Sequence, residues 1–154
     1  EILKNKKFMN YLSWSIKYDD LKYPNEVVEY LKPISFGNIW DLVLVYNRVI
    51  NSEARDKVSI ESYIPSGSEI INTKLDTEDK TVTNVATNIY FDREEFRDDK
   101  YFAYSEMLDS WIHNFSYTIR LTHKWEFNVK PTIIKETYNP EVFGRRSGVW
   151  FEVK

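Results

Sequence analysis

Apolar and polar residues alternate with a period of two along several segments of this chain, while helical periodicity is scarce. The clearest segment is 111–122, where six large and mostly apolar residues alternate with six that are mostly polar. Successive side chains of a β-strand point to opposite faces of its sheet, so this pattern predicts a strand with one buried face. The same alternation recurs in three further segments: 12–18, 58–64 and 149–153.

Residues 39–46 form a different kind of segment, because they are apolar on both faces apart from Asp41. Such a run suits a central strand that is covered on both sides. Turn signals separate the predicted strands, among them residues 65–67 and 139–140, and the polar residues 77–87 predict an exposed loop. We therefore expect an all-β fold built as an antiparallel β-sandwich. Two stretches could each add a short helix: Asn25 to Leu31 and Ser68 to Leu75.

The composition excludes several classes of function. The 154 residues carry 21 basic and 24 acidic side chains, so a net charge of −3 gives no general attraction to nucleic acid or to an anionic membrane. No apolar run approaches the roughly 18 residues that a transmembrane helix needs. The chain has no Cys, which removes disulfides, thiolate metal sites and Cys nucleophiles. It starts without a signal peptide, so we expect a fragment or a processed product.

The most charged segment packs seven charges into the eight residues 92–99. Opposite charges interleave there, which is typical of a surface patch that neutralises itself. Residues two apart share a face of an extended segment, so Glu95 and Arg97 could form an ion pair. We expect Glu95, Arg97, Asp98 and Asp99 to form a structural ion-pair knot, with an interface, a metal site or a catalytic site as the alternatives. No Gly follows, so a Ca²⁺ loop of the Asp-x-Asp-x-Asp-Gly type is absent.

Catalytic and cofactor motifs are missing from the sequence. There is no nucleophile elbow and no glycine-rich phosphate loop, and we expect no enzyme activity, no cofactor and no metal. The two histidines, His113 and His123, lie ten residues apart on one predicted strand, too far to share a metal at about 3.4 Å per residue. Three tryptophans could form a sugar-stacking platform, or could instead fill the core or line an interface: Trp40, Trp125 and Trp150.

Several motifs follow one another in a familiar order. The run YIPSGSEIIN at 63–72 comes first, REEFRDDKYFAY at 93–104 second, and a long run from Phe115 to Val153 last. Together they resemble the C-terminal domain of bacterial alpha-2-macroglobulins over residues 33–154. The positions that match the family's motifs are Arg97, Asp98, Asp99 and Lys100; Phe115, Tyr117 and Arg120; Pro131; and Tyr138, Asn139, Pro140 and Glu141.

The resemblance implies a macroglobulin-like β-sandwich in which the charged knot belongs to the scaffold. It implies a non-catalytic C-terminal module of a large protease-trapping protein, exported to the periplasm or cell envelope and usually lipid-anchored. Its partners would be neighbouring domains of the same chain and, through the full-length protein, target proteases. Residues 1–154 would form a single domain, with a linker or an edge strand from a preceding domain within residues 1–30. The alternative is a stand-alone immunoglobulin-like module that binds a glycan or a protein.

The candidate interface is Thr137, Tyr138, Asn139 and Pro140. Asn-Pro is a turn signal, which predicts a turn between a strand near 132–136 and the strand 149–153, at one end of the sandwich. Loops at a sandwich end are free to meet a neighbouring domain, and we expect this loop to do so. The alternative is that Tyr138 caps the core with its hydroxyl hydrogen-bonded. The resemblance also implies that a separate domain of the parent can carry a reactive thioester, which this domain would shield. Many relatives have Met just before the motif tyrosine, where a large apolar residue could cover the thioester from water. This chain has Thr137 there, a departure that favours a branch without a thioester.

Overall fold

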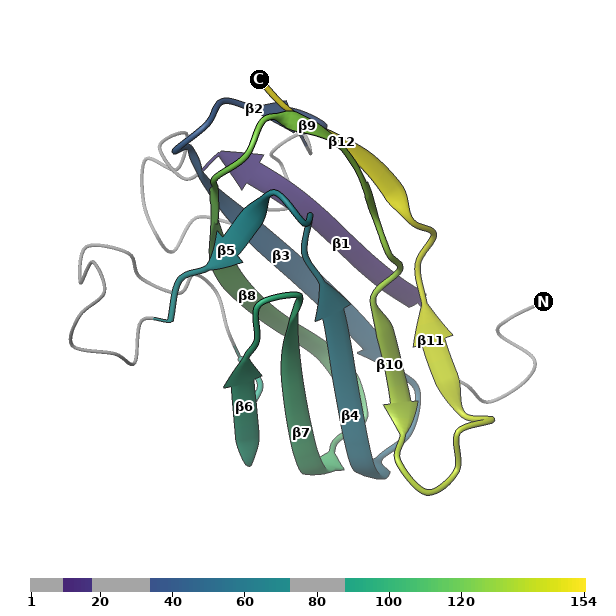
Figure 1. Cartoon of the computed structure of the whole chain (residues 1–154). Helices are drawn as coiled ribbons and strands as arrows, with labels where there is room; N and C mark the ends of the chain where they lie inside the picture. The colour runs from purple at the N-terminus through teal and green to yellow at the C-terminus, as the bar shows by residue number, and fades with distance from the viewer. Residues whose placement is uncertain (1–9, 18–33, 73–87) are drawn as a thin grey trace.

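The computed structural model describes residues 10–17, 34–72 and 88–154, and within these ranges every regular element is a β-strand (Figure 1). The prediction of an all-β fold is confirmed. In chain order the strands are β1 (Asn10–Lys17), β2 (Phe36–Gly37), β3 (Leu42–Asn51), β4 (Arg55–Tyr63), β5 (Ser68–Ile70), β6 (Arg93–Phe96), β7 (Lys100–Leu108), β8 (Trp111–Leu121), β9 (Trp125–Val129), β10 (Ile133–Glu136), β11 (Phe143–Arg145) and β12 (Val149–Val153).

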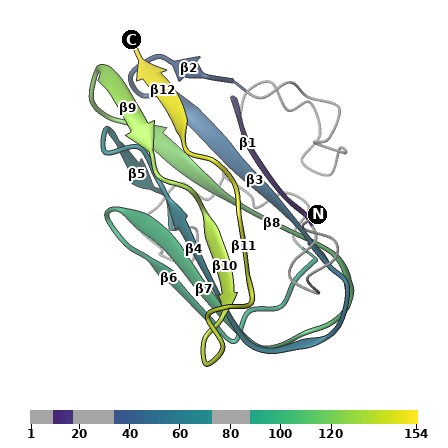
Figure 2. The same cartoon turned by 90° about the vertical axis from the view of Figure 1, so that its right-hand side faces the viewer.

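Two sheets face each other as the layers of a sandwich, as the edge-on view shows (Figure 2). One has the strand order β1-β3-β8-β5 and the other β11-β10-β4-β7-β6. A third sheet, β2-β12-β9, lies at the end of the molecule where the chain terminates (Figure 1). The strands pair antiparallel except β2 and β12, which run parallel. The expected antiparallel sandwich is therefore present.

Strand β3 is the central strand that the sequence predicts, since it lies between β1 and β8. Residues 43–47 are buried on both faces of it. The prediction of a half-buried β8 is wrong for its middle, where Ser116 and Thr118 are buried as well as the apolar residues between them. Small hydroxyl side chains are tolerated on a covered sheet face, so the polar half of the alternation does not mark a solvated face here.

Aromatic rings fill the space between the two facing sheets. The rings of Tyr101 and Tyr117 stack with centroids 4.9 Å apart, and Phe115 stacks on Tyr101 at 5.8 Å. The Tyr101 hydroxyl donates a hydrogen bond to Glu94 Oε1 at 2.6 Å. Burial of each such side chain stabilises the fold by about 1.5–3 kcal/mol, so this stack is a major part of the core.

The helix that the sequence allowed at 68–75 does not begin at Ser68, because residues 68–70 form strand β5. A Cβ at Gly67 would meet the Phe127 ring at 2.3 Å, so the turn before β5 packs directly against β9. β5 then pairs with β8 through Ile70 and Ile119. The other possible helix, Asn25 to Leu31, and the loop expected at 77–87 lie outside the described residues, as do residues 73–75.

Residues 125–153 form one long two-stranded ribbon. Ile134 lies opposite Gly144 in β10 and β11, and Val129 lies opposite Val149 in β9 and β12, so both halves keep one register. The ladder is interrupted at 130–132, where Pro131 has no N–H to donate. The tip of this ribbon is the loop at residues 137–142.

The N-terminal part of the described chain adds an edge strand. β1 pairs with β3 along its whole length, from Asn10 opposite Ile50 to Lys17 opposite Val43. These residues fall within the segment for which the sequence suggested a linker or an edge strand. That residues 1–154 form a single domain stays a prediction.

Candidate functional site

The charged residues 93–100 form a β-hairpin at the surface. Arg97 Nε donates to Glu95 Oε2 at 2.8 Å, and Arg93 pairs with the same carboxylate. These hydrogen bonds, that from Arg97 foremost, lower the pKa of Glu95. Asp98 and Asp99 occupy the turn, which the Arg97 N–H closes on the Lys100 carbonyl oxygen at 3.0 Å. Among the described residues neither aspartate side chain makes an ion pair, so the tight part of the knot is Glu95 with its two arginines.

The candidate interface loop protrudes at the opposite end of these strands (Figure 1). Its first residue continues the ladder of β4, since the Thr137 N–H donates to the Lys57 carbonyl oxygen at 2.8 Å. The Val142 N–H donates to the Asn139 carbonyl oxygen at 2.9 Å and closes the turn. The Tyr138 side chain is 80 % exposed, so its ring lies outside the core. The structure therefore holds a large aromatic side chain in solvent on a backbone that is fixed at its base.

Three side chains on the outer face of β4 and β7 border Tyr138. The Lys57 ammonium lies 5.6 Å from the centroid of the Tyr138 ring and 3.3 Å from Glu106 Oε1. The Tyr104 hydroxyl donates to the other oxygen of Glu106, and this bond raises the pKa of Tyr104 to about 12. The bonds from Tyr104 and Lys57 lower the pKa of Glu106, which keeps its carboxylate ionised.

Lys57 has a backbone conformation that is rare for a residue with a Cβ. Its φ is 55°, in the left-handed region. The ladder pairs Asp56 with Met107 and Val58 with Ser105, and Lys57 lies between them. A left-handed residue of this kind costs about 1–2 kcal/mol and persists where the surroundings hold it. Here the bond from Thr137 and the ion pair to Glu106 do so, which makes the strand beneath the loop a constrained site.

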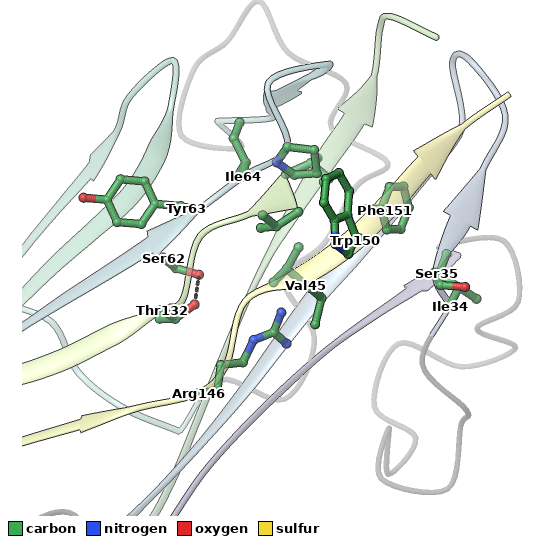
Figure 3. A pocket seen from close by; sticks show the side chains of 14 residues that line it. Ile34, Ser35, Val45, Ser62, Tyr63, Ile64, Thr132, Arg146, Trp150 and Phe151 are labelled. Atoms are coloured by element: carbon green, nitrogen blue, oxygen red, sulfur yellow. Dashed lines mark hydrogen bonds between the residues drawn. The ribbon is translucent and has the colours of Figure 1, made fainter. Parts of the chain in front are cut away.

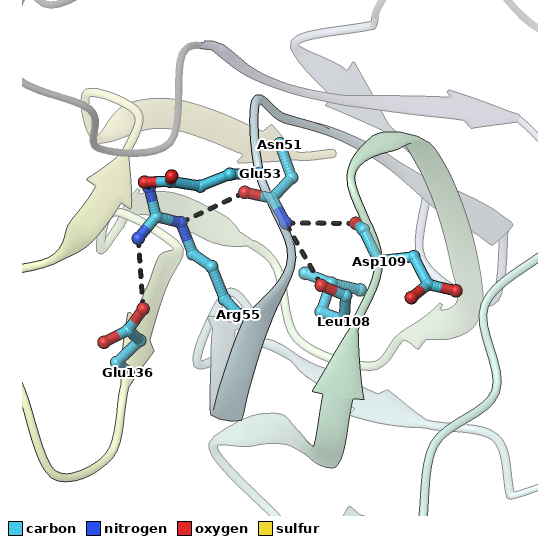
Figure 4. A network of polar contacts seen from close by, with 6 residues as sticks. All are labelled: Asn51, Glu53, Arg55, Leu108, Asp109 and Glu136. Carbon is cyan, nitrogen blue, oxygen red and sulfur yellow. Dashed lines mark hydrogen bonds and ion pairs between the residues drawn. The ribbon is translucent and has the colours of Figure 1, made fainter.

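A buried arginine anchors the same end of the sandwich (Figure 4). Arg55 is 6 % exposed, and its guanidinium donates to Asn51 Oδ1 at 3.1 Å, Glu136 Oε1 at 3.0 Å and Glu53 Oε1 at 3.1 Å. Glu136 is the last residue of β10, directly before the Thr137 loop. The Asn51 amide in turn donates to the carbonyl oxygens of Leu108 and Asp109. One cation thus ties β10 to the β3–β4 turn and, through Asn51, to the end of β7.

The sequence did not predict this network, nor the contacts of Lys57 with Tyr138 and Glu106. The turn residues Asn51 and Ser52 were visible in the sequence, but nothing there distinguishes Arg55 from the exposed arginines around it. The usable signal was weak: a single arginine lies three residues before the strand predicted at 58–64. Glu136, its main partner, lies 81 residues away along the chain.

A cavity of about 280 Å³ opens between the sheets near the interruption of the ribbon (Figure 3). Its lining is mostly apolar, with Arg146 directed into it and the hydroxyls of Ser62 and Thr132 at its side. Ser62 Oγ lies 3.0 Å from Thr132 Oγ1 and 2.6 Å from the Tyr117 hydroxyl. Burial raises the pKa of Tyr117. Of the described residues that line this cavity, none carries a carboxylate or an imidazole, so they offer no acid–base pair for catalysis.

The remaining candidates from the sequence are separate from one another. His113 is bonded to the Asp109 carbonyl oxygen at 2.7 Å, and His123 lies at the other end of β8 beside Thr122. Within the described ranges no three His, Asp or Glu side chains form a group that could hold a metal ion. In the same residues, no helix has the length and apolarity to cross a membrane. Trp40, Trp125 and Trp150 are exposed, which excludes a place in the core for them, while an interface role and a sugar-stacking role stay predictions.

Comparison with known proteins supplies the family. The model of the bacterial alpha-2-macroglobulin MG10 domain matches residues 35–141 of this chain. The chain belongs to the bacterial alpha-2-macroglobulin family. The alpha-2-macroglobulin of Xylella fastidiosa is 31 % identical over 90 residues, which cover 53 % of this chain and 6 % of that protein. The resemblance seen in the sequence motifs is therefore confirmed.

Solved alpha-2-macroglobulins share the fold. The trypsin-activated protein from Escherichia coli superposes with a TM-score of 0.71 at 17 % identity, over 94 % of this chain and 10 % of that chain. The Escherichia coli protein activated by porcine elastase gives 0.72 at 19 % identity, over 94 % of this chain and 13 % of that chain. This alpha-2-macroglobulin domain spans a small fraction of the relatives that it matches.

Proposed function

We propose that this chain is the non-catalytic C-terminal module of a bacterial alpha-2-macroglobulin-like protease inhibitor, and that it packs against and shields neighbouring domains through the loop Thr137–Pro140. The observation that carries the proposal is the exposed Tyr138 ring on an anchored ribbon tip. Large aromatic side chains exposed on a fixed backbone are the usual anchors of protein interfaces, because little conformational entropy is lost when they are covered.

The family supports the wider role. Two of the similar Escherichia coli proteins are described as activated by trypsin and by elastase, so they respond to proteases. By analogy, the full-length parent of this chain would engage target proteases, and this module would contribute packing rather than chemistry. We place the parent outside the cytoplasm, in the periplasm or at the cell envelope as a lipid-anchored protein. The family favours this function over a stand-alone immunoglobulin-like module.

The test compares Tyr138→Ala in two proteins, the 154-residue chain and its full-length parent. In the short chain, we expect almost unchanged thermal stability, because the ring is exposed. In the full-length protein, we expect faster cleavage by added protease or, where a thioester exists, faster spontaneous hydrolysis. Trp125→Ala is the matched control, since Trp125 is an exposed aromatic residue on β9, away from the ribbon tip.

A full-length Tyr138→Ala protein that matches wild type in both assays would remove the interface role of the loop. Equal effects of Tyr138→Ala and Trp125→Ala would also contradict it, because the effect would then not be specific to the ribbon tip. A large stability loss in the short chain alone would assign Tyr138 to packing within the domain.

A further inference from the structure

Two further large hydrophobic side chains are exposed at the end of the sandwich that carries the Tyr138 loop. Tyr90 is 80 % exposed and Met107 is 62 % exposed. Both line a hollow of about 390 Å³ between the segment that precedes β6 and the end of β7. Exposed Tyr and Met side chains together are enriched in protein interfaces and depleted elsewhere on a surface.

A chain of three contacts links this hollow to the ribbon tip. Lys57 lies against the Tyr138 ring and pairs with Glu106 at 3.3 Å. The backbone N–H of Glu106 donates to Asp92 Oδ2 at 2.7 Å, and both residues line the hollow. A partner seated on Tyr138 that extends along β7 would therefore cover the hollow as well.

The charged residues of the hollow indicate which kind of side chain would fit it. Asp92, Glu106 and Asp109 line it together with His113, and among the described residues its lining contains no Lys or Arg. Lys57 pairs with Glu106 from the Tyr138 side, whereas the carboxylates of Asp92 and Asp109 have no Lys or Arg beside them in the described part of the lining. A lysine or arginine side chain matches this combination, because its stem is apolar and its head is cationic.

We propose that the hollow between Tyr90 and Met107 is a second part of the domain interface, and that the adjoining domain of the same polypeptide inserts a lysine or arginine side chain into it. The inference rests on the proposed function, since it requires that the loop at 137–140 meets that domain. The occupant is assigned to the same polypeptide because this domain covers only 10 % and 13 % of the solved relatives' chains, so most of the parent lies outside it.

Met107 reports directly on whether the surface is covered. Methionine oxidation follows exposure, so we expect Met107 in the full-length protein to react with hydrogen peroxide about tenfold more slowly than a methionine peptide in the same solution. Digestion and mass spectrometry give the rate at this single position. Asp109→Lys places a like charge against the inserted cation and should return Met107 to a rate near that of the peptide. Added salt should act in the same direction, because it screens the ion pair.

Glu152→Lys is the matched control, since Glu152 is an exposed carboxylate on β12, in the sheet at the other end of the molecule. It should leave the oxidation rate of Met107 unchanged. Oxidation of Met107 in the wild-type protein at the rate of the peptide would overturn the proposal. Protection that grows with protein concentration would overturn it too, because it would assign the occupant to a second copy of the chain.

The result also separates this inference from the proposed function. If Tyr138→Ala speeds protease cleavage or thioester hydrolysis of the full-length protein but Met107 is unprotected in the wild type, the loop contacts its neighbour and the hollow does not. If Tyr138→Ala has no effect and Met107 is unprotected, both proposals are wrong. Protected Met107 that is insensitive to Asp109→Lys and to salt would refute the inserted cation.

Discussion

Two groups of arginine ion pairs in this domain have similar chemistry and opposite environments. In the surface hairpin, the Arg97 side chain is 48 % exposed and pairs with Glu95 two residues away. At the other end of the sandwich, the Arg55 side chain is 5 % exposed and pairs with Glu136, 81 residues away. When an exposed ion pair is broken, water replaces the lost partner, so little stability is lost. When a buried ion pair is broken, the remaining charge has neither water nor a partner, so the loss is large. Burial, and not the local density of charge, decides which group holds the fold together.

The largest expected effect is that of Arg55→Ala. The change leaves the Glu136 carboxylate and the Asn51 amide oxygen partly buried without their donor, and we expect the free energy of unfolding to fall by about 3–5 kcal/mol. Chemical denaturation of the 154-residue chain measures it. Arg55→Lys keeps the charge but loses the fork geometry, so it should recover only part of the loss. A loss below about 1 kcal/mol for Arg55→Ala would mean that the buried network behaves like a surface pair.

The second prediction compares a buried tyrosine with an exposed one at alkaline pH. Burial and the Glu94 carboxylate raise the pKa of Tyr101 far above its ordinary value of 10.0, so the folded state keeps its proton while the unfolded chain loses it. Stability is complete below this ordinary value and should fall at higher pH by about 1.4 kcal/mol per pH unit for this residue.

Tyr101→Phe should make that decline shallower at every alkaline pH, whereas Tyr104→Phe removes a hydroxyl whose pKa is about 12 and should affect the decline only between about pH 10 and pH 12. Denaturation curves at several alkaline pH values, together with tyrosinate absorbance, measure both. Equal slopes for wild type and Tyr101→Phe would show that the buried hydroxyl ionises in the folded state.

A third prediction concerns a buried hydroxyl without a charge. The Tyr117 hydroxyl lies 2.6 Å from Ser62 Oγ, and Ser62 keeps a second contact with Thr132. Tyr117→Phe should therefore cost only about 1 kcal/mol, less than the loss of the Arg55 network. Equilibrium unfolding gives the value. A cost as large as that of Arg55→Ala would show that the hydroxyl chain, rather than the ion network, dominates the polar core.

The smallest expected effect belongs to the hairpin that looks most functional in the sequence. Arg97→Ala should leave the melting temperature of the chain within measurement error of the wild type, because exposed ion pairs contribute little and are screened by salt. A clear drop that disappears in high salt would show that the hairpin charges act as a connected network.

The sequence was sufficient for the fold because the pattern that predicts strands is local. Alternation placed β4, β8 and β12, and the doubly apolar run placed β3 at the centre of its sheet. The turn at 137–142 followed from Asn139-Pro140, but the short strand β11 did not, since Phe143 to Arg145 carry no alternation long enough to detect.

The site depends on contacts between distant residues, which a single sequence does not contain. The exposed state of Tyr138, the left-handed Lys57 beneath it and the Glu136 partner of Arg55 all arise from the alignment of β4 beside β10. Short-range reasoning instead favoured residues 95–99, because their charges are neighbours in the chain. The helix allowed at 68–75 failed for a similar reason, since the pairing of residues 68–70 with β8 joins segments far apart in the chain.

Hydrogen–deuterium exchange tests the central claim most directly, when it is measured on the 154-residue chain and on its full-length parent. The claim is that the ribbon tip, and not the charged hairpin, is the face of this module toward its neighbours. We expect the amides of residues 137–142 to be slower to exchange in the parent than in the short chain, and those of residues 97–99 to be equal in both. Protection confined to 97–99, or equal exchange of 137–142 in both proteins, would contradict the account.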